Sequence, residues 1–231
     1  MSGKPLSNEK PKQDRCQARR RFLQSALGAG LAVGATSAVR ASEPGPGGTA
    51  KVRVGLIGTD GHTGVILGSI PQLPGVELTA FAKSLPDDDV SNLKRAKAFS
   101  EQTRIYDHFE EMLEKEELDI VGVFLPYYRN AEASIAAARR GVHVVSEKPV
   151  ATTLEDLAAL KAAVAQAKVR LTSLMNMRCF PPYRAARKAV QEGLIGEPIL
   201  LTSQKSYRFG SARPWFYKDL RTYGGTIPWA G

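Results

Sequence analysis

From residue 51 onward, short apolar runs of strand length alternate with longer stretches of helical periodicity. Strand-like runs are expected at 51–58, 75–82, 104–107, 118–126, 141–149 and 169–176. Apolar residues at helical spacing fall between them, at 62–70, 90–102, 109–117, 130–140 and 153–168. This alternation predicts βαβ units, and strands that are apolar almost throughout fit a parallel sheet covered on both faces. We therefore expect an α/β fold with a Rossmann-like, doubly wound parallel sheet over residues 51–175.

The pattern changes after residue 175. A helix that begins with two prolines is expected at 181–193, and a long strand at 197–209. Residues 176–231 are therefore interpreted as the beginning of an α+β C-terminal domain for substrate binding or oligomerisation. This segment is too short to complete such a domain, so we interpret the chain as part of a longer protein.

The N-terminal 41 residues resemble an export signal. Arg19, Arg20 and Arg21 precede Phe22 and an Ala/Gly-rich run, and the small residues before a cleavage site end at Ala41. This order is typical of a twin-arginine signal peptide. The alternative, an anchoring helix, is disfavoured because the apolar run is too short and too rich in glycine to span a bilayer.

A Pro/Gly-rich linker is expected at 42–50, after the signal. We expect the protein to be periplasmic or secreted, with the twin-arginine export machinery as a partner.

The basic charge of the chain lies mostly in that signal. The formal net charge is +9, from 32 Lys/Arg and 23 Asp/Glu. Residues 1–41 hold eight Lys/Arg and two Asp/Glu, or +6, which leaves +3 for the remainder. No basic stripe interleaved with aromatic residues follows, so nucleic acid is not an expected partner.

Cysteine and histidine usage indicates neither disulfides nor a metal. Removal of the signal takes Cys16 away and leaves Cys179 alone, with no activating base near it in the sequence. His62, His108 and His143 show no metal-ligand spacing with one another or with Cys179. No metal site is predicted.

Ligands of open parallel sheets bind beyond the C-terminal ends of the strands. Here that rule selects the loops 58–64, 82–84, 125–130 and 147–149. The first reads GTDGHTG, between a strand and a helix, which is the position of a phosphate-binding loop. Its spacing is G-x-x-G-x-x-G rather than G-x-G-x-x-G, so a simple tight turn is the alternative. The predicted cofactor-binding residues in it are Gly58, Thr59, Asp60, Gly61, His62, Thr63 and Gly64.

The end of the second strand bears on the choice of dinucleotide. An acid there usually binds the adenosine ribose of NAD, but this chain has Lys83 and Ser84 at that position. The acidic residues 87–89 lie too far along the chain for this role. A cation and a hydroxyl suit a 2′-phosphate, so the sequence predicts NADP in preference to NAD. The alternative is that Lys83 is a solvated surface lysine.

The run SEKPV places Glu147, Lys148 and Pro149 at the end of a buried strand facing the cleft, where a charged pair is costly unless it is partnered or used. With its neighbours, this run resembles the Gfo/Idh/MocA family of NAD(P)-dependent oxidoreductases. The resemblance covers roughly residues 51–231 and rests on VGLIG, FLP, GVHVVSEKPV, NMRCFPPY and GLIGEP at the family's separations.

The resemblance implies an oxidoreductase that transfers hydride between a nicotinamide and a sugar- or polyol-type hydroxyl or carbonyl. It places Lys148 beside the nicotinamide and the substrate, as the catalytic residue. It also implies a homo-oligomer in the complete protein. The cofactor-binding residues that it adds are Leu125, Pro126, Tyr127, Asn130, Glu147, Lys148, Pro149 and Arg178.

The chain departs from the family pattern at three positions. Tyr127 and Asn130 stand where the family usually has Asn and His, and Trp229 stands where its Asp is expected. The principal general acid/base therefore cannot be assigned. Two alternatives stay open: an NAD-dependent glycosidase of the same family, and a non-catalytic module that binds a nucleotide or a sugar.

Overall fold

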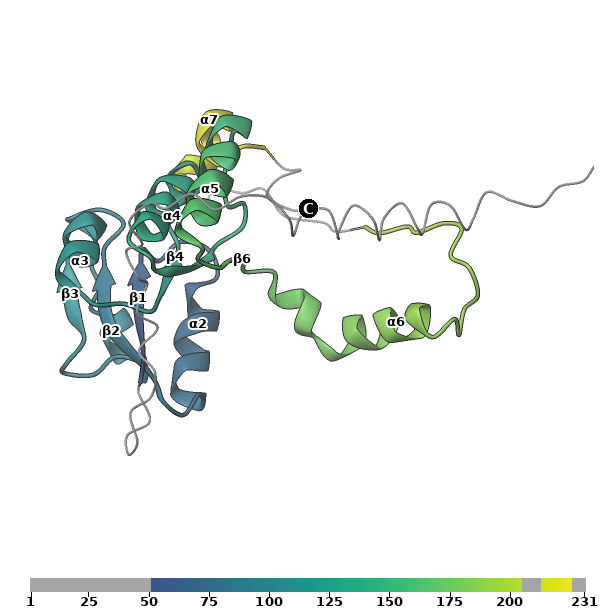
Figure 1. The fold of residues 1–231 in the computed structure, drawn as a ribbon, viewed down its shortest axis with the longest axis horizontal. Helices are drawn as coiled ribbons and strands as arrows, with labels where there is room; N and C mark the ends of the chain where they lie inside the picture. Colours follow the sequence, from purple (N-terminus) through teal and green to yellow (C-terminus); the bar gives the residue numbers. More distant parts are fainter. Residues whose placement is uncertain (1–50, 205–212, 226–231) are drawn as a thin grey trace, which may run out of the picture. The chain divides into compact units, whose positions relative to one another are not determined.

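The structure is a computed structural model that describes residues 51–204 and 213–225 (Figure 1). The signal at 1–41, the linker at 42–50 and Trp229 lie outside the described residues. Among the described helices, none combines the length and the apolar character needed to cross a membrane.

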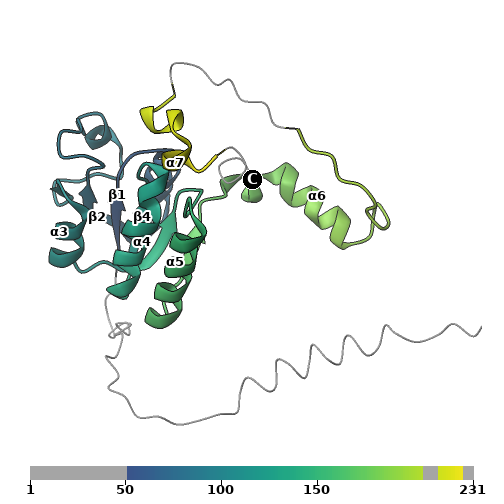
Figure 2. The same ribbon diagram turned by 90° about the horizontal axis from the view of Figure 1, so that it is seen from above.

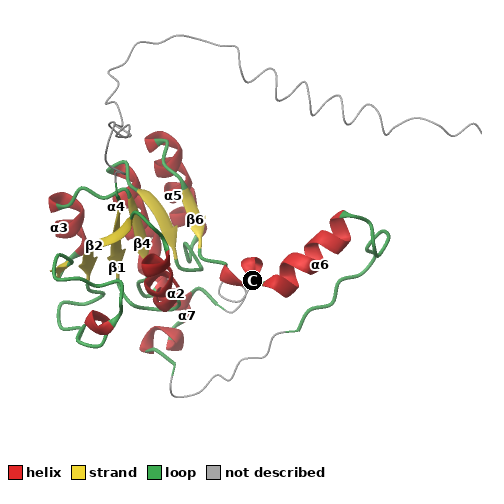
Figure 3. Cartoon of the chain, turned by 90° about the horizontal axis from the view of Figure 1, so that it is seen from below, coloured by secondary structure: helices red, strands yellow, loops and turns green. Residues whose placement is uncertain are grey.

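Six parallel strands form one sheet in the order β3-β2-β1-β4-β5-β6 (Figures 1 and 3). Because β1 pairs with both β2 and β4, the direction of winding reverses between β1 and β4. Ligands bind at such a switch point. The predicted doubly wound, Rossmann-like sheet is confirmed. The strands are β1 (Val52–Ile57), β2 (Val76–Ala82), β3 (Arg104–Tyr106), β4 (Ile120–Val123), β5 (His143–Ser146) and β6 (Leu171–Ser173).

Helices connect the strands and cover both faces of the sheet (Figures 1 and 2). The α-helices are α2 (Thr63–Ser69), α3 (Phe109–Lys115), α4 (Asn130–Arg139), α5 (Leu154–Ala167), α6 (Pro181–Gln191) and α7 (Leu220–Tyr223). The short 3₁₀ helices are η1 (Ile70–Gln72), η2 (Leu93–Arg95), η3 (Tyr127–Arg129), η4 (Asn176–Cys179) and η5 (Trp215–Lys218).

Alternation along β1 builds two separate cores. Leu56 joins a cluster with Leu67 of α2, whereas Ile57 joins a cluster on the other face with Met112 of α3. Successive side chains of a strand point to opposite faces, so each strand contributes to both cores. Leu56, Ile57 and Met112 are completely buried. The two cores hold the carboxyl ends of β1 and β4 in fixed positions.

The helix expected at 90–102 is not formed, apart from η2. Val90 and Ala98 still pack onto the core that contains Leu56, but they do so from consecutive turns. The Asp89 carboxylate accepts a hydrogen bond from the backbone N–H of Ser91 at 2.8 Å, and Thr103 Oγ1 accepts one from Ser100 N at 3.1 Å. Such local side-chain hydrogen bonds compete with those of a helix.

The strand expected at 197–209 is also absent from its described part, 197–204. Ile199, Leu200 and Leu201 are largely exposed, at 97%, 84% and 91%. A strand forms only where a neighbouring strand satisfies its backbone groups, and this segment has no such neighbour among the described residues. The interpretation of 176–231 as the beginning of a second domain stays a prediction.

Candidate functional site

The glycine loop after β1 contacts the residues at the ends of β2, β4 and β5. Gly58 and Gly61 have φ of +76° and +73°, a conformation that favours glycine. A Cβ on Gly58 would lie 2.3 Å from the Phe124 carbonyl oxygen, and one on Gly61 would lie 2.7 Å from Glu147 Cδ. A Cβ on Gly64 would meet nothing within 4 Å. The fold itself therefore requires glycine at two of the three positions, and the third leaves the backbone open to a ligand.

Glu147 ties the end of β5 to this loop. Its side chain is fully buried, and its Oε2 accepts a hydrogen bond from the backbone N–H of His62 at 3.0 Å. Its Oε1 lies 2.9 Å from His62 Nδ1, while the imidazole is 43% exposed. A buried carboxylate is costly unless it is hydrogen-bonded, so this pair fixes the position of the loop. Both residues were predicted at the site, and the structure brings them into direct contact.

Asn130 joins the ends of β4 and β5 from the first residue of α4. It is completely buried, and its Oδ1 accepts a hydrogen bond from Leu125 N at 3.1 Å. Its Nδ2 donates to the carbonyl oxygens of Pro149 at 3.1 Å and of Glu147 at 3.5 Å. Both halves of the amide are therefore bonded to backbone groups of other predicted site residues. Through these hydrogen bonds, Asn130 holds the segments that follow β4 and β5 in position relative to each other.

Lys148 lies in the turn that Glu147 and Asn130 hold. It is half-buried between the buried residues Glu147 and Pro149, and the peptide bond between Lys148 and Pro149 is cis. Pro126, the N-cap of η3, is also buried. The predicted catalytic lysine is thus located where the loops after β4 and β5 meet.

Tyr127 belongs to an aromatic cluster that sequence reasoning missed, made up of Tyr127, Phe216, Tyr217 and Tyr223. The Tyr127 ring is 2% exposed, and its hydroxyl lies 2.6 Å from the hydroxyl of Tyr217. Its ring meets Phe216 edge to face, with centroids 5.1 Å apart. Tyr127 therefore attaches η5 and α7 to the end of β4. In the sequence, the aromatic run WFYK at 215–218 is the feature from which this cluster could have been predicted.

Lys83 does not point to an open position at the end of β2. Its ammonium lies 2.8 Å from Asp107 Oδ1 and donates to the carbonyl oxygen of Pro86 at 2.7 Å. Ser84, by contrast, faces the glycine loop, since its Oγ accepts a hydrogen bond from Thr59 N at 3.4 Å. Lys83 and Ser84, which together suggested a 2′-phosphate site, thus point to different places: Lys83 to Asp107 and Ser84 to the glycine loop.

Asp60 and Asp88 lie near Ser84. Burial and the neighbouring charge of Asp88 raise the pKa of Asp60 from 3.8 to about 6, and a hydrogen bond with Ser84 partly offsets this rise. Asp88 reaches this position through a tight turn, in which Leu85 N donates to Asp88 Oδ2 at 2.9 Å and Asp88 N donates to the Leu85 carbonyl at 3.0 Å. Asp88 therefore lies close enough to Asp60 for its charge to act there, and the expectation that residues 87–89 come too late to bind the ribose stays a prediction.

Two further residues that were predicted at the site, Thr63 and Arg178, lie on α2 and η4. Thr63 is buried at the start of α2, and its hydroxyl donates to the Asp60 carbonyl at 3.4 Å. Arg178 and Cys179 lie on η4, where the Cys179 thiol is exposed. Across residues 51–204 and 213–225, no group of three or more His, Cys, Asp or Glu residues could hold a metal ion.

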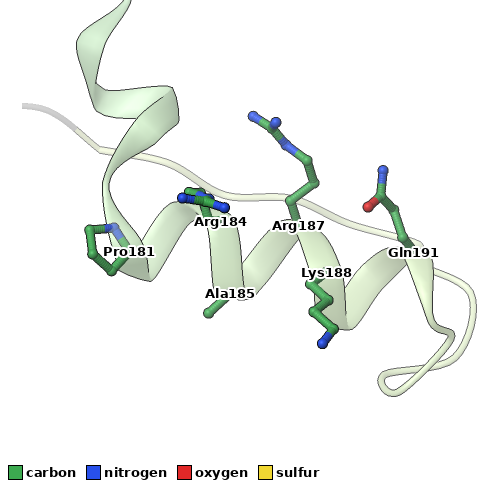
Figure 4. Close-up of a pocket in the computed structure, with 6 residues that line it drawn as sticks. All are labelled: Pro181, Arg184, Ala185, Arg187, Lys188 and Gln191. Atoms are coloured by element: carbon green, nitrogen blue, oxygen red, sulfur yellow. The ribbon is translucent and has the colours of Figure 1, made fainter. Parts of the chain in front are cut away.

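A hollow of about 540 Å³ runs along α6 (Figure 4). In Figure 4, Arg187 and Gln191 extend from one side of the helix, and Ala185 and Lys188 extend from the opposite side. These side chains do not converge, so the hollow lacks the arrangement of a binding site. Its lining residues are Pro181, Arg184, Ala185, Arg187, Lys188 and Gln191.

Comparison with known proteins supports the fold. The family model described as "Oxidoreductase family, NAD-binding Rossmann fold" matches residues 52–174. A solved structure of a putative oxidoreductase from Thermotoga maritima is 34% identical, with a TM-score of 0.69, and the alignment covers 77% of this chain and 54% of that one. The matched residues 52–174 contain the glycine loop, the end of β4 and the Glu147–Pro149 turn.

Among the curated relatives are proteins whose names state an activity, and two of them serve as examples. A glycosyl hydrolase family 109 protein from Solibacter usitatus is 30% identical over 139 residues, which cover 56% of this chain and 31% of the relative. A D-xylose 1-dehydrogenase (NADP(+)) from Haloferax volcanii is 30% identical over 177 residues, which cover 75% and 52%. The chain thus spans about half or less of the length of these relatives.

Replacement of Gly61 by alanine should disturb the loop. Alanine at φ +73° is strained, and its Cβ would collide with the buried Glu147 side chain, so we expect a loss of about 1–3 kcal/mol of unfolding free energy. Gly64→Ala is the matched control, because its Cβ has open space within a helix and should leave stability unchanged or slightly raised. Urea denaturation measures both. Equal effects of the two substitutions would show that Glu147 does not restrict the loop at Gly61.

Replacement of Asp60 by asparagine should stabilise the chain in a pH-dependent manner. The folded state holds the Asp60 proton up to about pH 6 and the unfolded state only to about 3.8, so wild-type stability falls as pH rises between these values. An asparagine side chain cannot ionise, so the variant lacks this loss. We expect Asp60→Asn to be about 1–2 kcal/mol more stable at pH 7.5, allowing for partial hydration of the carboxyl, with most of this gain lost by pH 4. A difference that stays constant across this range would contradict the raised pKa.

Proposed function

Because the chain belongs to the Gfo/Idh/MocA family of NAD-binding oxidoreductases, we propose that it binds a nicotinamide dinucleotide at the carboxyl ends of its strands. The reaction is hydride transfer between the nicotinamide and a sugar- or polyol-type hydroxyl or carbonyl. The observation that carries the proposal is the contact of three separate loops around Glu147: the glycine loop, the end of β4 and the Glu147–Pro149 turn.

The residues present fit a dinucleotide. The Gly58–Gly64 loop keeps its backbone open at Gly64, where a side chain would meet nothing within 4 Å. Backbone N–H groups in such a glycine loop bind phosphate oxygens. The buried Leu125 and Pro126 provide an apolar wall beside the Lys148 turn. When bound, the nicotinamide supplies the hydride donor or acceptor.

Lys148 is the residue of this chain that acts on the substrate oxygen. Its ammonium can donate a hydrogen bond to a carbonyl that is being reduced, and in its neutral form the amine can take up the proton of a hydroxyl that is being oxidised. Glu147 and Asn130 act indirectly, since their hydrogen bonds hold the turn that carries the lysine. Which dinucleotide binds depends on the groups around Ser84. The sequence argument for NADP relied on Lys83, whose ammonium is engaged by Asp107 and Pro86.

A second candidate is a glycosidase that uses its nicotinamide transiently, which the similarity to the glycosyl hydrolase family 109 protein favours. Such an enzyme regenerates its cofactor in every cycle. Release of p-nitrophenol from nitrophenyl glycosides without accumulation of reduced nicotinamide would identify it. Accumulation of reduced nicotinamide in proportion to an oxidised sugar identifies the dehydrogenase.

Lys148→Ala tests the catalytic assignment. We expect kcat/KM on the best substrate from a panel of aldoses and polyols to fall by roughly 10²–10⁴-fold, as for loss of a general acid or base. The dissociation constant of the dinucleotide should change less than about threefold, because the glycine loop is untouched. Lys161→Ala, on the exposed face of α5, is the matched control and should leave both values unchanged. Undiminished turnover by Lys148→Ala would remove the lysine from the mechanism.

Export by the twin-arginine pathway is also part of this proposal. It rests on Arg19 and Arg20, which precede an Ala/Gly-rich run in the sequence. The double variant Arg19→Lys, Arg20→Lys should accumulate in the cytoplasm at its full length, whereas wild type should reach the periplasm in a shortened form. Cell fractionation with an antibody to the chain measures this, and Lys10→Arg with Lys12→Arg is the control. Equal export of the variant and wild type would contradict a twin-arginine signal.

A further inference from the structure

The end of β2 and the glycine loop after β1 form one continuous surface. Gly58 N donates to the Ala82 carbonyl at 2.8 Å, and Thr59 N donates to Ser84 Oγ at 3.4 Å. A Cβ on Gly58 would lie 2.8 Å from the same Ser84 oxygen. In dinucleotide-binding folds, the group that contacts the hydroxyls of the adenosine ribose stands at this position. No acid follows β2 directly in this chain, because residues 83 and 84 are lysine and serine.

A carboxylate reaches this position from a different element. Asp60 follows Thr59 in the glycine loop, and the Thr59 N–H donates to Ser84 Oγ at 3.4 Å, which brings this part of the loop next to Ser84. The Ser84 hydroxyl and the charge of Asp88 both act on the Asp60 carboxyl group. The backbone N–H of Asp60 donates to the Phe124 carbonyl at 2.8 Å, which anchors the residue between β1 and β4. Asp60 therefore presents its carboxyl group beside the Ser84 hydroxyl, and Asp88 makes the local potential more negative.

The cations of this region already have partners. Lys83 pairs with Asp107 at 2.8 Å and is also bonded to the Pro86 carbonyl. Arg129 pairs with Glu132 at 3.4 Å, donates to the Ser84 carbonyl at 3.2 Å and lies over the Phe109 ring, 5.9 Å from its centroid. A phosphate at Ser84 would have to compete with a carboxylate for either cation.

We propose that the Asp60 carboxylate and the Ser84 hydroxyl bind the adenosine ribose hydroxyls, so that the chain selects NAD over NADP. This inference rests on the proposed function, because it assumes a dinucleotide at this edge of the sheet. Ribose hydroxyls donate hydrogen bonds, and a carboxylate accepts them strongly. A 2′-phosphate is a monoester with a charge of about −1.5 to −2 at neutral pH and offers acceptors only. It would be repelled by Asp60 and Asp88.

Isothermal titration of the purified chain with NAD⁺ and with NADP⁺ tests this proposal without any substrate. At pH 8 the Asp60 carboxyl is ionised, since its pKa is about 6. We expect NAD⁺ to bind at least about tenfold more tightly than NADP⁺, in line with the strength of hydrogen bonds to charged groups. Raising the salt concentration should narrow the difference, because screening weakens the repulsion of the phosphate.

Asp60→Asn keeps the shape of the side chain and removes its charge. We expect it to weaken NAD⁺ binding and strengthen NADP⁺ binding, so that the selectivity falls by about tenfold or more. Ser84→Ala should weaken the binding of NAD⁺ by a smaller factor than Asp60→Asn does, and it should leave the binding of NADP⁺ unchanged. Asp87→Asn is the matched control: it removes the same charge from an exposed neighbouring position and should leave the selectivity unchanged. Lys83→Ala should not reduce the affinity for NADP⁺.

Two results would overturn the inference while leaving the proposed function intact. One is tighter binding of NADP⁺ than of NAD⁺ by wild type, with the preference lost in Lys83→Ala. The other is an unchanged selectivity in a folded Asp60→Asn variant, with folding checked by circular dichroism. If neither dinucleotide binds to folded wild type, the proposed function fails and the inference fails with it.

Discussion

The buried carboxylate of Glu147 is the interaction on which the arrangement of the site depends. It lies at the end of β5, with no exposure to solvent, and accepts a hydrogen bond from the backbone of the glycine loop. A buried carboxyl group without hydrogen-bond partners would be costly, so the loop and the turn hold each other in place. The need for glycine at position 61 follows, since any side chain there would occupy the space of the Glu147 carboxyl group. The neighbouring Lys148 gains a fixed position from the same contact.

Much of the fold could be predicted because its strands are buried on both faces and are therefore apolar throughout. The runs at β1 and β4 stand out in the sequence for this reason. The helix expected at 153–168 is formed as α5, and its N-cap is Thr153, whose Oγ1 accepts a hydrogen bond from Asp156 N at 3.1 Å. The failures at 90–102 and 197–204 share one cause. Apolar spacing indicates that side chains seek burial, but hydrogen-bond partners decide whether the backbone becomes a helix or a strand.

The site was predictable in its location but not in the direction of its long side chains. Parallel strands bring their ends together, so the four loops could be selected from the sequence alone. The sequence does not reveal that the Lys83 ammonium meets Asp107, which follows a different strand. Nor does it reveal that a turn at Pro86 carries Asp88 back to Asp60, although Pro followed by Asp is a turn signal. Tyr127 is a further example, because its partner Tyr217 lies 90 residues further along the chain.

Hydrogen–deuterium exchange with and without NADH would test most directly whether these loops act together as a dinucleotide site. We predict slower exchange in residues 58–64, 125–130 and 147–148 together when NADH is present, because a ligand there would order the loops that Glu147 and Asn130 connect. The amides of α6, at 181–191, should exchange at the same rate in both conditions. Protection confined to α6, or an absence of change at the glycine loop with NADH in excess, would contradict a dinucleotide site at the carboxyl ends of the strands.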